Sequence, residues 1–456
     1  MISPRPIVAI VGRPNVGKST LFNRLVGKQL AIVHDRPGVT RDRHYADAFS
    51  LGREYTLIDT GGFDPYGDDA MKQGITHQLQ VAMDEADVII CVFDATLTAT
   101  SADSDEIQLL RRTDKPVLYM ANKSDSTRAE NEGNDLYRLG MDKLFFVSAL
   151  HGRGLAEFES ALVDALPPPQ QDGAEEDENE STHRPLRIAI VGRPNAGKSS
   201  IVNRLLGQER LLVDDRPGTT RDPIDSVVER RGNLYQLIDT AGVRRKSRVQ
   251  KGRDAVEAAS VVQAIRSIDR AEVVILMCDA GRGVEEQDAK ILGLALDRGR
   301  SIVIALNKVD LLRGDAKKDA ERKAREVLAF APWAPIATVS AKTGRGIEKL
   351  LTVARQSNAA FNKRVKTGEL NRFFETVISA NPPPTHGGRA PRFYFMTQAH
   401  ARPPTFMIVT SHPDSLHFSY QRYVINAIRK QFGFEGTPIR VHYRRKDRKP
   451  KGRHNS

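Results

Sequence analysis

The chain contains one 17-residue stretch twice, with small changes. "VGRPNVGKSTLFNRLVG" runs from Val11 to Gly27, and "VGRPNAGKSSIVNRLLG" runs from Val191 to Gly207. In each copy a Gly-rich loop joins an apolar strand-like segment to a helix-like segment. Such a loop lets backbone N–H groups surround a phosphate, because Gly tolerates the dihedral angles and the close approach that this requires. The duplication therefore predicts two phosphate-binding domains in tandem.

The repeat extends beyond the loop. Asp59 recurs as Asp239 at an offset of 180 residues, and Asn122 recurs as Asn307 at an offset of 185. Insertions in loops produce this drift, and so long a period indicates tandem domains and not a solenoid. In both halves nearly continuous apolar strands, such as "VIICVFD" and "VVILMCD", alternate with helical segments. This pattern is typical of a doubly wound α/β domain with a mostly parallel sheet.

A third unit follows the repeat. A helical stretch around Leu370 to Val377, two strand candidates ("RFYFMTQA" and "TFMIVTS"), an amphipathic helix and a closing strand predict a small α+β domain. The string "GFEG" from Gly433 to Gly436 is interpreted as a helix cap plus a turn. We expect a first domain at 1–166, an acidic Pro-rich linker at 167–185, a second domain at 186–357, a third domain at 358–445 and a basic tail at 446–456.

The positive charge is concentrated at the C-terminal end. The whole chain carries a net +12, while residues 357–456 hold 18 Lys plus Arg against 5 Asp plus Glu, a net +13. Such a cluster predicts salt-sensitive, largely sequence-blind contacts with nucleic-acid phosphates, although a solvated terminal charge run stays an alternative. The candidate RNA-binding residues are Arg440, Arg444, Arg445, Lys446, Arg448, Lys449, Lys451 and Arg453.

Cysteine content and hydrophobicity indicate the compartment. Cys91 and Cys278 both lie in apolar strand-like runs, which argues against a disulfide framework or a zinc site. No run of apolar residues approaches the length of a membrane span. We therefore expect a cytoplasmic protein that does not enter a membrane.

The repeated loops predict the phosphate contacts in detail. Lys18 and Lys198 would reach the β- and γ-phosphates, while Ser19 and Ser199 would bind Mg²⁺. The full loops are Gly12, Arg13, Pro14, Asn15, Val16, Gly17, Lys18, Ser19 and Thr20, and Gly192, Arg193, Pro194, Asn195, Ala196, Gly197, Lys198, Ser199 and Ser200.

A second pair of motifs follows an apolar strand in each half. Asp59 and Asp239 can hold Mg²⁺ through water, and the amides of Gly62 and Gly242 can sense the γ-phosphate. Thr40 and Thr220 lie in polar loops suited to a switch that closes over Mg²⁺ and the γ-phosphate. The motif residues are Asp59, Thr60, Gly61, Gly62 and Phe63, and Asp239, Thr240, Ala241, Gly242 and Val243.

A third pair of motifs predicts the base. The carboxylates of Asp125 and Asp310 can accept from N1–H and the exocyclic amine of guanine, whereas adenine would leave that charge unpaired. The motif residues are Asn122, Lys123, Ser124 and Asp125, and Asn307, Lys308, Val309 and Asp310. Two further segments would present a backbone N–H to guanine O6: Ser148 and Ala149, and Ser340, Ala341 and Lys342.

Together these motifs resemble the Der (EngA) family of bacterial double-domain GTPases, within the TrmE-Era-EngA group. The resemblance covers essentially the whole chain. It implies two GTP/GDP sites with Mg²⁺, a KH-like third domain, and a role in assembly of the large ribosomal subunit through its rRNA. It implies neither DNA nor a membrane as a partner, and we expect a monomer.

Two departures from the wider GTPase pattern bear on catalysis. Phe63 and Val243 stand where Ras-like proteins carry a water-orienting Gln, so intrinsic turnover is expected to be slow. Relatives with this apolar residue use K⁺ beside the phosphates with help from a loop Asn, which matches Asn15 and Asn195. That these Asn residues only brace the loop stays an alternative.

The second departure is Leu150, which replaces in the first module the Lys342 of the second. Since the O6 contact would come from a backbone amide, the first site is expected to bind guanine more weakly without losing it. Two alternative functions stay open: a nucleotide-dependent RNA-binding scaffold with little useful hydrolysis, and a tRNA-modifying GTPase. The latter would need a catalytic thiol that neither strand cysteine supplies.

Overall fold

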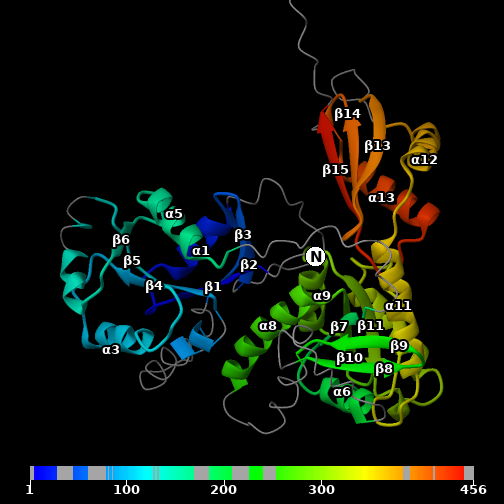
Figure 1. Ribbon diagram of the computed structural model, residues 1–456, viewed down its shortest axis with the longest axis horizontal. Coiled ribbons are helices and arrows are strands. Elements are labelled where there is room, and N and C mark those ends of the chain that lie inside the picture. Colours follow the sequence, from blue (N-terminus) through cyan, green and yellow to red (C-terminus); the bar gives the residue numbers. More distant parts are fainter. Residues whose placement is uncertain are drawn as a thin grey trace, which may run out of the picture. The chain divides into compact units, whose positions relative to one another are not determined.

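The computed structural model describes residues 5–27, 45–59, 79–80, 82–84, 86–126, 129–130, 133–168, 184–207, 225–239, 253–383, 391–413 and 416–445. The chain divides into two compact units, one drawn from residues 1–176 and 246–269 and the other from 177–245 and 270–456. The first contains one six-stranded sheet, and the second contains a six-stranded and a three-stranded sheet (Figure 1).

The first six-stranded sheet has the strand order β2-β3-β1-β4-β5-β6. Every pair is parallel except the edge pair β2–β3. Every residue of β1 and β4 is buried, as expected for strands covered on both faces. The elements are β1 Ile7–Val11, α1 Lys18–Gly27, β2 Tyr45–Ser50, β3 Arg53–Asp59, β4 Val88–Asp94, α3 Ser101–Leu110, β5 Val117–Asn122, the 3₁₀ helix η2 Asn134–Leu139, β6 Leu144–Val147 and α5 Leu155–Ala165.

The second six-stranded sheet repeats this order as β8-β9-β7-β10-β11-β12, again with one antiparallel edge pair. The predicted tandem, mostly parallel α/β domains are therefore confirmed. The edge strands β2 and β8 were not predicted, because "YADAFS" and "SVVER" lack a continuous apolar run. The elements are β7 Leu186–Val191, α6 Lys198–Gly207, β8 Ser226–Arg230, β9 Asn233–Leu237, α8 Arg253–Arg270, β10 Val273–Asp279, α9 Glu286–Asp297, β11 Ser301–Asn307, η4 Val309–Leu311, α10 Ala316–Val327, β12 Ile336–Thr338 and α11 Ile347–Asn362.

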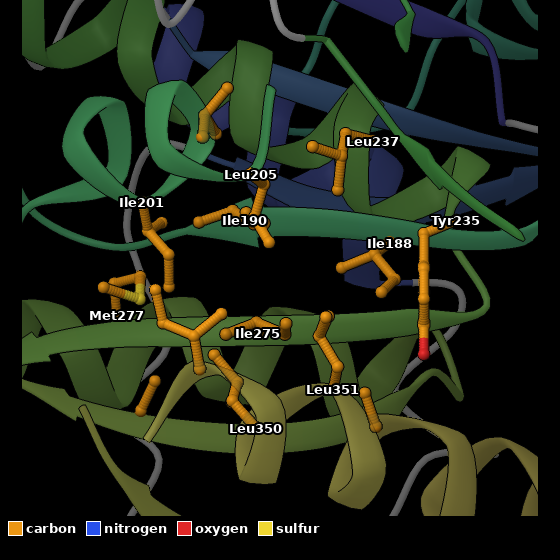
Figure 2. Close-up of a cluster of buried hydrophobic side chains, with 14 of the residues drawn as sticks. Ile188, Ile190, Ile201, Leu205, Tyr235, Leu237, Ile275, Met277, Leu350 and Leu351 are labelled. Atoms are coloured by element: carbon orange, nitrogen blue, oxygen red, sulfur yellow. The ribbon is translucent and has the colours of Figure 1, made fainter. Parts of the chain in front are cut away.

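The core of the second module lies between its sheet and the helices α6 and α11 (Figure 2). Ile275 and Met277 of β10 face Leu350 of α11 in this cluster. Val274 and Leu276 alternate with them, point to the other face of the sheet, and are equally buried. Both faces of the sheet are therefore covered.

The third domain packs two helices on one face of its three-stranded sheet (Figure 1). Strand β14 pairs antiparallel with β13 and parallel with β15. The predicted helices and strands are confirmed, including the end of the last helix at Gly433, whose φ is 70°. The elements are α12 Thr367–Ala380, β13 Phe393–His400, β14 Thr405–Thr410, α13 Phe418–Phe432 and β15 Arg440–Arg445.

The turn after α13 joins the third domain to the second module. The backbone N–H of Ile302 donates to the carbonyl of Gly436 (2.7 Å), and the N–H of Gly436 donates to the carbonyl of Trp333 (3.2 Å). The guanidinium of Arg429 lies over the Trp333 ring, 4.5 Å from its centroid. The "GFEG" string is thus a helix cap and a turn, as predicted, and its backbone serves a contact between domains.

Two details differ from the expected organisation of this region. Helix α11 runs continuously through residue 357, where we expected the second domain to end. Arg440 was expected in an outward basic row, yet it is only half-exposed and its guanidinium donates to the carbonyl of Asp297 at the end of α9 (2.6 Å). His442 and Arg444 do lie exposed on that strand.

Candidate functional site

The phosphate loop of the first module has a backbone that requires its glycines. Gly12 has a φ of 137° and Gly17 a φ of 97°. A Cβ on Gly12 would overlap the carbonyl oxygen of Val92, and a Cβ on Gly17 would overlap the side-chain amide of Asn122. Asn15 has a φ of 66°, in the left-handed region that Asn tolerates better than most residues. The loop therefore has the glycine-dependent backbone that its sequence predicts.

Lys18 and Ser19 lie at the start of α1, where the helix N-terminus favours a phosphate. The Lys18 ammonium donates to the carbonyls of Gly12 (2.5 Å) and Arg13 (2.8 Å), which keeps it inside the loop. The Ser19 hydroxyl donates to a carboxylate oxygen of Asp59 (2.7 Å). The two predicted Mg²⁺ ligands thus meet at the end of β3, and a hydroxyl plus a carboxylate suits this hard cation.

The predicted base-recognition residues of the first module form one network. The Asn122 side chain donates to the carbonyl of Val16 (2.8 Å) and accepts from the N–H of Ala149 (3.0 Å). It therefore fixes the phosphate loop against the Ser148–Ala149 segment. The Ser148 hydroxyl donates to the exposed carboxylate of Asp125 (2.5 Å), which orients that carboxylate at the surface.

The second module reproduces this geometry. Gly192 and Gly197 have φ of 141° and 100°, and Lys198 donates to the carbonyls of Gly192 and Arg193, each at 2.7 Å. Asn307 donates to the carbonyl of Ala196 (2.8 Å) and accepts from the N–H of Ala341 (2.9 Å). The two sites therefore share the same internal bracing.

Two carboxylates of the second module have pKa values below their usual range. A hydrogen bond from Ser340 is the main reason why the pKa of Asp310 lies below its usual value. Burial by itself would raise the pKa of Asp279, but the hydrogen bond from Lys308 (2.6 Å) and two backbone N–H groups lower it. Both carboxylates are therefore ionised at neutral pH, and Asp310 keeps the charge that the predicted guanine contact requires.

Several residues of the sites were not predicted. Asp94, the counterpart of Asp279, accepts from Lys123 at 2.5 Å. Arg24 donates to the Ala149 carbonyl (2.8 Å), and Arg204 donates to the Ala341 carbonyl (2.7 Å). The signal for the arginines was present, because both stand at the same place in the repeated stretch. Each holds the backbone whose N–H is expected to meet guanine O6.

The loop arginines Arg13 and Arg193 point toward a neighbouring helix. Arg193 donates to Asp288 at the start of α9 (2.9 Å), and Arg13 lies 3.5 Å from Asp103 at the start of α3. The two modules differ here, since the second ion pair is shorter and Asp288 is fully buried. These arginines position the loop from outside.

Part of the predicted sites lies outside the described residues. These predictions stay untested: Thr40, Thr60, Gly61, Gly62, Phe63, Thr220, Thr240, Ala241, Gly242, Val243, Lys446, Arg448, Lys449, Lys451 and Arg453. Of the remaining predicted positions, Pro14, Pro194 and Asn195 lie in the loops, and Thr20, Ser199 and Ser200 lie in the first turn of α1 or α6. Val309 begins η4, and the residues beyond the ends of their strands are Ser124, Asp239 and Lys342.

Comparison with known proteins identifies the family. A model described as "50S ribosome-binding GTPase" matches residues 7–123 and 187–308, and one described as "KH-domain-like of EngA bacterial GTPase enzymes, C-terminal" matches residues 364–444. GTPase Der of Geotalea daltonii is 45% identical over 98% of this chain and 100% of its own length. The chain belongs to the Der (EngA) family of GTPases. GTPase Der of Moorella thermoacetica is also 45% identical, over 97% of this chain and 99% of its own.

Family membership confirms the resemblance seen in the motifs. It shows a GTP-binding, GTP-hydrolysing enzyme with a KH-like C-terminal domain. Among solved structures, Era in complex with MgGDPNP and part of 16S ribosomal RNA aligns with 58% of this chain and 93% of its own, at 16% identity and a TM-score of 0.30. Among the described helices, none combines the length and hydrophobicity needed to cross a bilayer.

Proposed function

We propose that the chain is a switch with two GTP sites that binds rRNA of the large ribosomal subunit and acts in ribosome biogenesis. The observation that carries this proposal is the duplicated bracing of the phosphate loop by Asn122 and Asn307. Because each Asn connects the phosphate loop to the base-recognition segment of its own module, each site can hold both ends of one nucleotide. The proteins it resembles at near full length are named GTPases.

Each site would hold Mg²⁺ through its Ser and Asp. In the first module the contact between Ser19 and Asp59 supports this assignment. The ion would neutralise charge on the β- and γ-phosphates, and Lys18, which donates to two loop carbonyls, would reach the same phosphates. Thr40 and Gly62 would close the first site over the γ-phosphate, and the second site would use the matching residues Thr220 and Gly242.

We also propose that K⁺ supplies positive charge at the transition state, with help from Asn15 and Asn195. The left-handed backbone of both residues gives an independent reason for Asn at these positions. Equal GTP turnover in Na⁺ and K⁺ would therefore refute the K⁺ proposal, and Asn15 and Asn195 would then only brace the loop.

The open face of the third sheet is the best supported RNA surface. Phe395 of β13 is 46% exposed and pairs with Val409, which pairs in turn with the exposed Arg444 of β15. The opposite face carries Phe406 and packs on the helices. An exposed aromatic ring beside arginines suits base stacking together with phosphate contacts. The basic residues after Arg445 would extend this surface.

Base selection is tested site by site. Asp125→Asn and Asp310→Asn should each convert one site from guanine to xanthine nucleotides, because the amide can no longer accept from two N–H groups of guanine. Radiolabelled GTP and XTP binding to each variant gives the stoichiometry. If both variants still bind two equivalents of GTP, the assignment of these carboxylates to guanine recognition is refuted.

Ribosome binding is tested by co-sedimentation with purified large subunits in GTP and GDP. Phe395→Ala and Arg444→Ala should weaken co-sedimentation, whereas Arg322→Ala, an exposed arginine on α10, serves as the matched control. The scaffold alternative is distinguished by turnover: large subunits with K⁺ should accelerate GTP hydrolysis, and unchanged hydrolysis would favour a scaffold.

We further propose that the protein is monomeric and cytoplasmic.

A further inference from the structure

The first module contains a buried acid beside its phosphate loop that the proposed chemistry does not use. Glu106 lies on α3 and is 2% exposed. Within the described part of the chain, neither of its carboxyl oxygens accepts a hydrogen bond from a nitrogen or oxygen donor. The nearby Asp103, in contrast, caps the same helix and faces Arg13. A buried carboxyl whose only hydrogen-bond donor is a thiol is costly when charged, so its protonation state is sensitive to its neighbours.

The neighbours of Glu106 come from four elements. Burial is the main cause that raises its pKa, to about 7, and the charge of Asp103 adds to this effect. The charge of Lys18 on α1 lowers the pKa, a weak hydrogen bond from the Cys91 thiol of β4 lowers it as well, and the charge of Arg13 in the loop adds to this. The Cys91 thiol is itself held protonated, because burial raises its pKa well above the usual value. Glu106 thus titrates near neutral pH, within reach of the charge of the loop lysine.

The second module provides an internal comparison. Asp103 and Asp288 hold the same place at the starts of α3 and α9, so the residue that corresponds to Glu106 three positions later is Ile291. Ile291 is also buried. The same site in the same fold therefore tolerates a purely apolar side chain, and packing alone does not account for an acid in the first module.

We propose that Glu106 is a positioning residue that couples nucleotide binding in the first site to uptake of a proton. This inference rests on the proposed nucleotide binding by the first module. When Glu106 is ionised, its charge attracts the Lys18 ammonium and repels the phosphates. When it is protonated, the ammonium is available to the β- and γ-phosphates. A bound nucleotide brings negative charge close to Glu106, which favours its protonated form further.

The direction of the pH dependence follows from linkage. A group that binds its proton more tightly in the complex than in the free protein weakens binding as pH rises through the free-protein value. The first site should therefore lose affinity between about pH 6.5 and 8.5, by roughly threefold to tenfold and by no more than tenfold per pH unit for one proton. The second site should show only the titration of the nucleotide itself.

The experiment uses the full chain with Lys198→Ala to silence the second site. Affinity for Mg·GDP is measured by calorimetry from pH 6.5 to 8.5, in two buffers of different ionisation enthalpy, which reports proton uptake directly. Glu106→Gln and Glu106→Ile should abolish both the uptake and the pH slope. Asp105→Asn removes an equal charge from an exposed position on the same helix and should behave like the parent chain.

Three results would overturn the inference. These are a parent chain without proton uptake, a Glu106→Gln variant with an unchanged slope, or an Ile291→Glu chain, tested with Lys18→Ala, whose second site acquires no slope. This reciprocal variant also covers the case in which substitution of Glu106 prevents folding. Absence of nucleotide binding at every pH would instead refute the proposed function of the first site.

Discussion

The turn between Gly433 and Gly436 allows a sharp test of how the third domain is attached. Both glycines lie in the left-handed region, with φ of 70° and 71°. A Cβ on Gly433 would meet nothing within 4 Å, whereas a Cβ on Gly436 would overlap the side chain of the buried Ser357. Gly433→Ala is therefore a matched control for Gly436→Ala.

The expected costs follow from these surroundings. Each alanine should lose about 1–2 kcal/mol from the left-handed backbone. At Gly436, overpacking against Ser357 should add about 1–3 kcal/mol. Relief of that clash requires the turn to shift, which weakens the hydrogen bond from Ile302 to Gly436. The difference between the two variants corresponds to a factor of about 5 to 150 in the local opening equilibrium.

Hydrogen exchange followed by mass spectrometry measures this difference. Peptides that contain the start of β11 should exchange faster in Gly436→Ala than in Gly433→Ala, while peptides from the first module should be unchanged. Equal exchange in the two variants would refute the reasoning, because it would mean that the turn does not pack on the second module.

Three further predictions concern the modules. Burial raises the pKa of Glu106 from 4.5 to about 7, so the folded protein holds a proton that the unfolded chain has released. The free energy of unfolding of the first module should therefore fall by about 3 kcal/mol as pH rises from 4.5 to 7. Urea denaturation of Glu106→Gln should lack this fall. Asn122→Ala removes two buried hydrogen bonds between loops, worth about 1–3 kcal/mol, and should weaken nucleotide binding to the first site roughly tenfold in a filter assay. Arg193→Ala leaves the fully buried Asp288 without its guanidinium partner and should cost about 3–5 kcal/mol in thermal or urea unfolding, whereas Arg13→Ala, whose ion pair is longer, should cost less.

Strand positions and loop chemistry were predictable because both depend on local sequence. Continuous apolar runs predicted the central parallel strands, and the Gly-rich loops predicted the conformation at Gly12 and Gly17. The amphipathic pattern of the third domain likewise predicted α13 and its end at Gly433.

Other features depend on contacts between distant segments. The use of Arg440 in a contact with Asp297 could not be predicted, since alternation along a strand says which face a side chain takes and not what lies opposite. The edge strand β2 forms by pairing with β3 and not through its own weak apolar pattern. Glu106 also gave no signal, because its helix position reads as solvated until β4 and the phosphate loop are seen to cover it.

The attachment of the third domain links it to the elements of the second module that carry the predicted base-recognition residues. Strand β11 begins beside Gly436 and ends at Asn307, and α11 starts shortly after Ala341 and finishes where the third domain begins. A strand and a helix thus connect the predicted base-recognition residues of the second module to the third domain. We therefore expect a shift of the turn at Gly436 to change the position of Asn307, and the reverse, in any variant that keeps β11 and α11 intact.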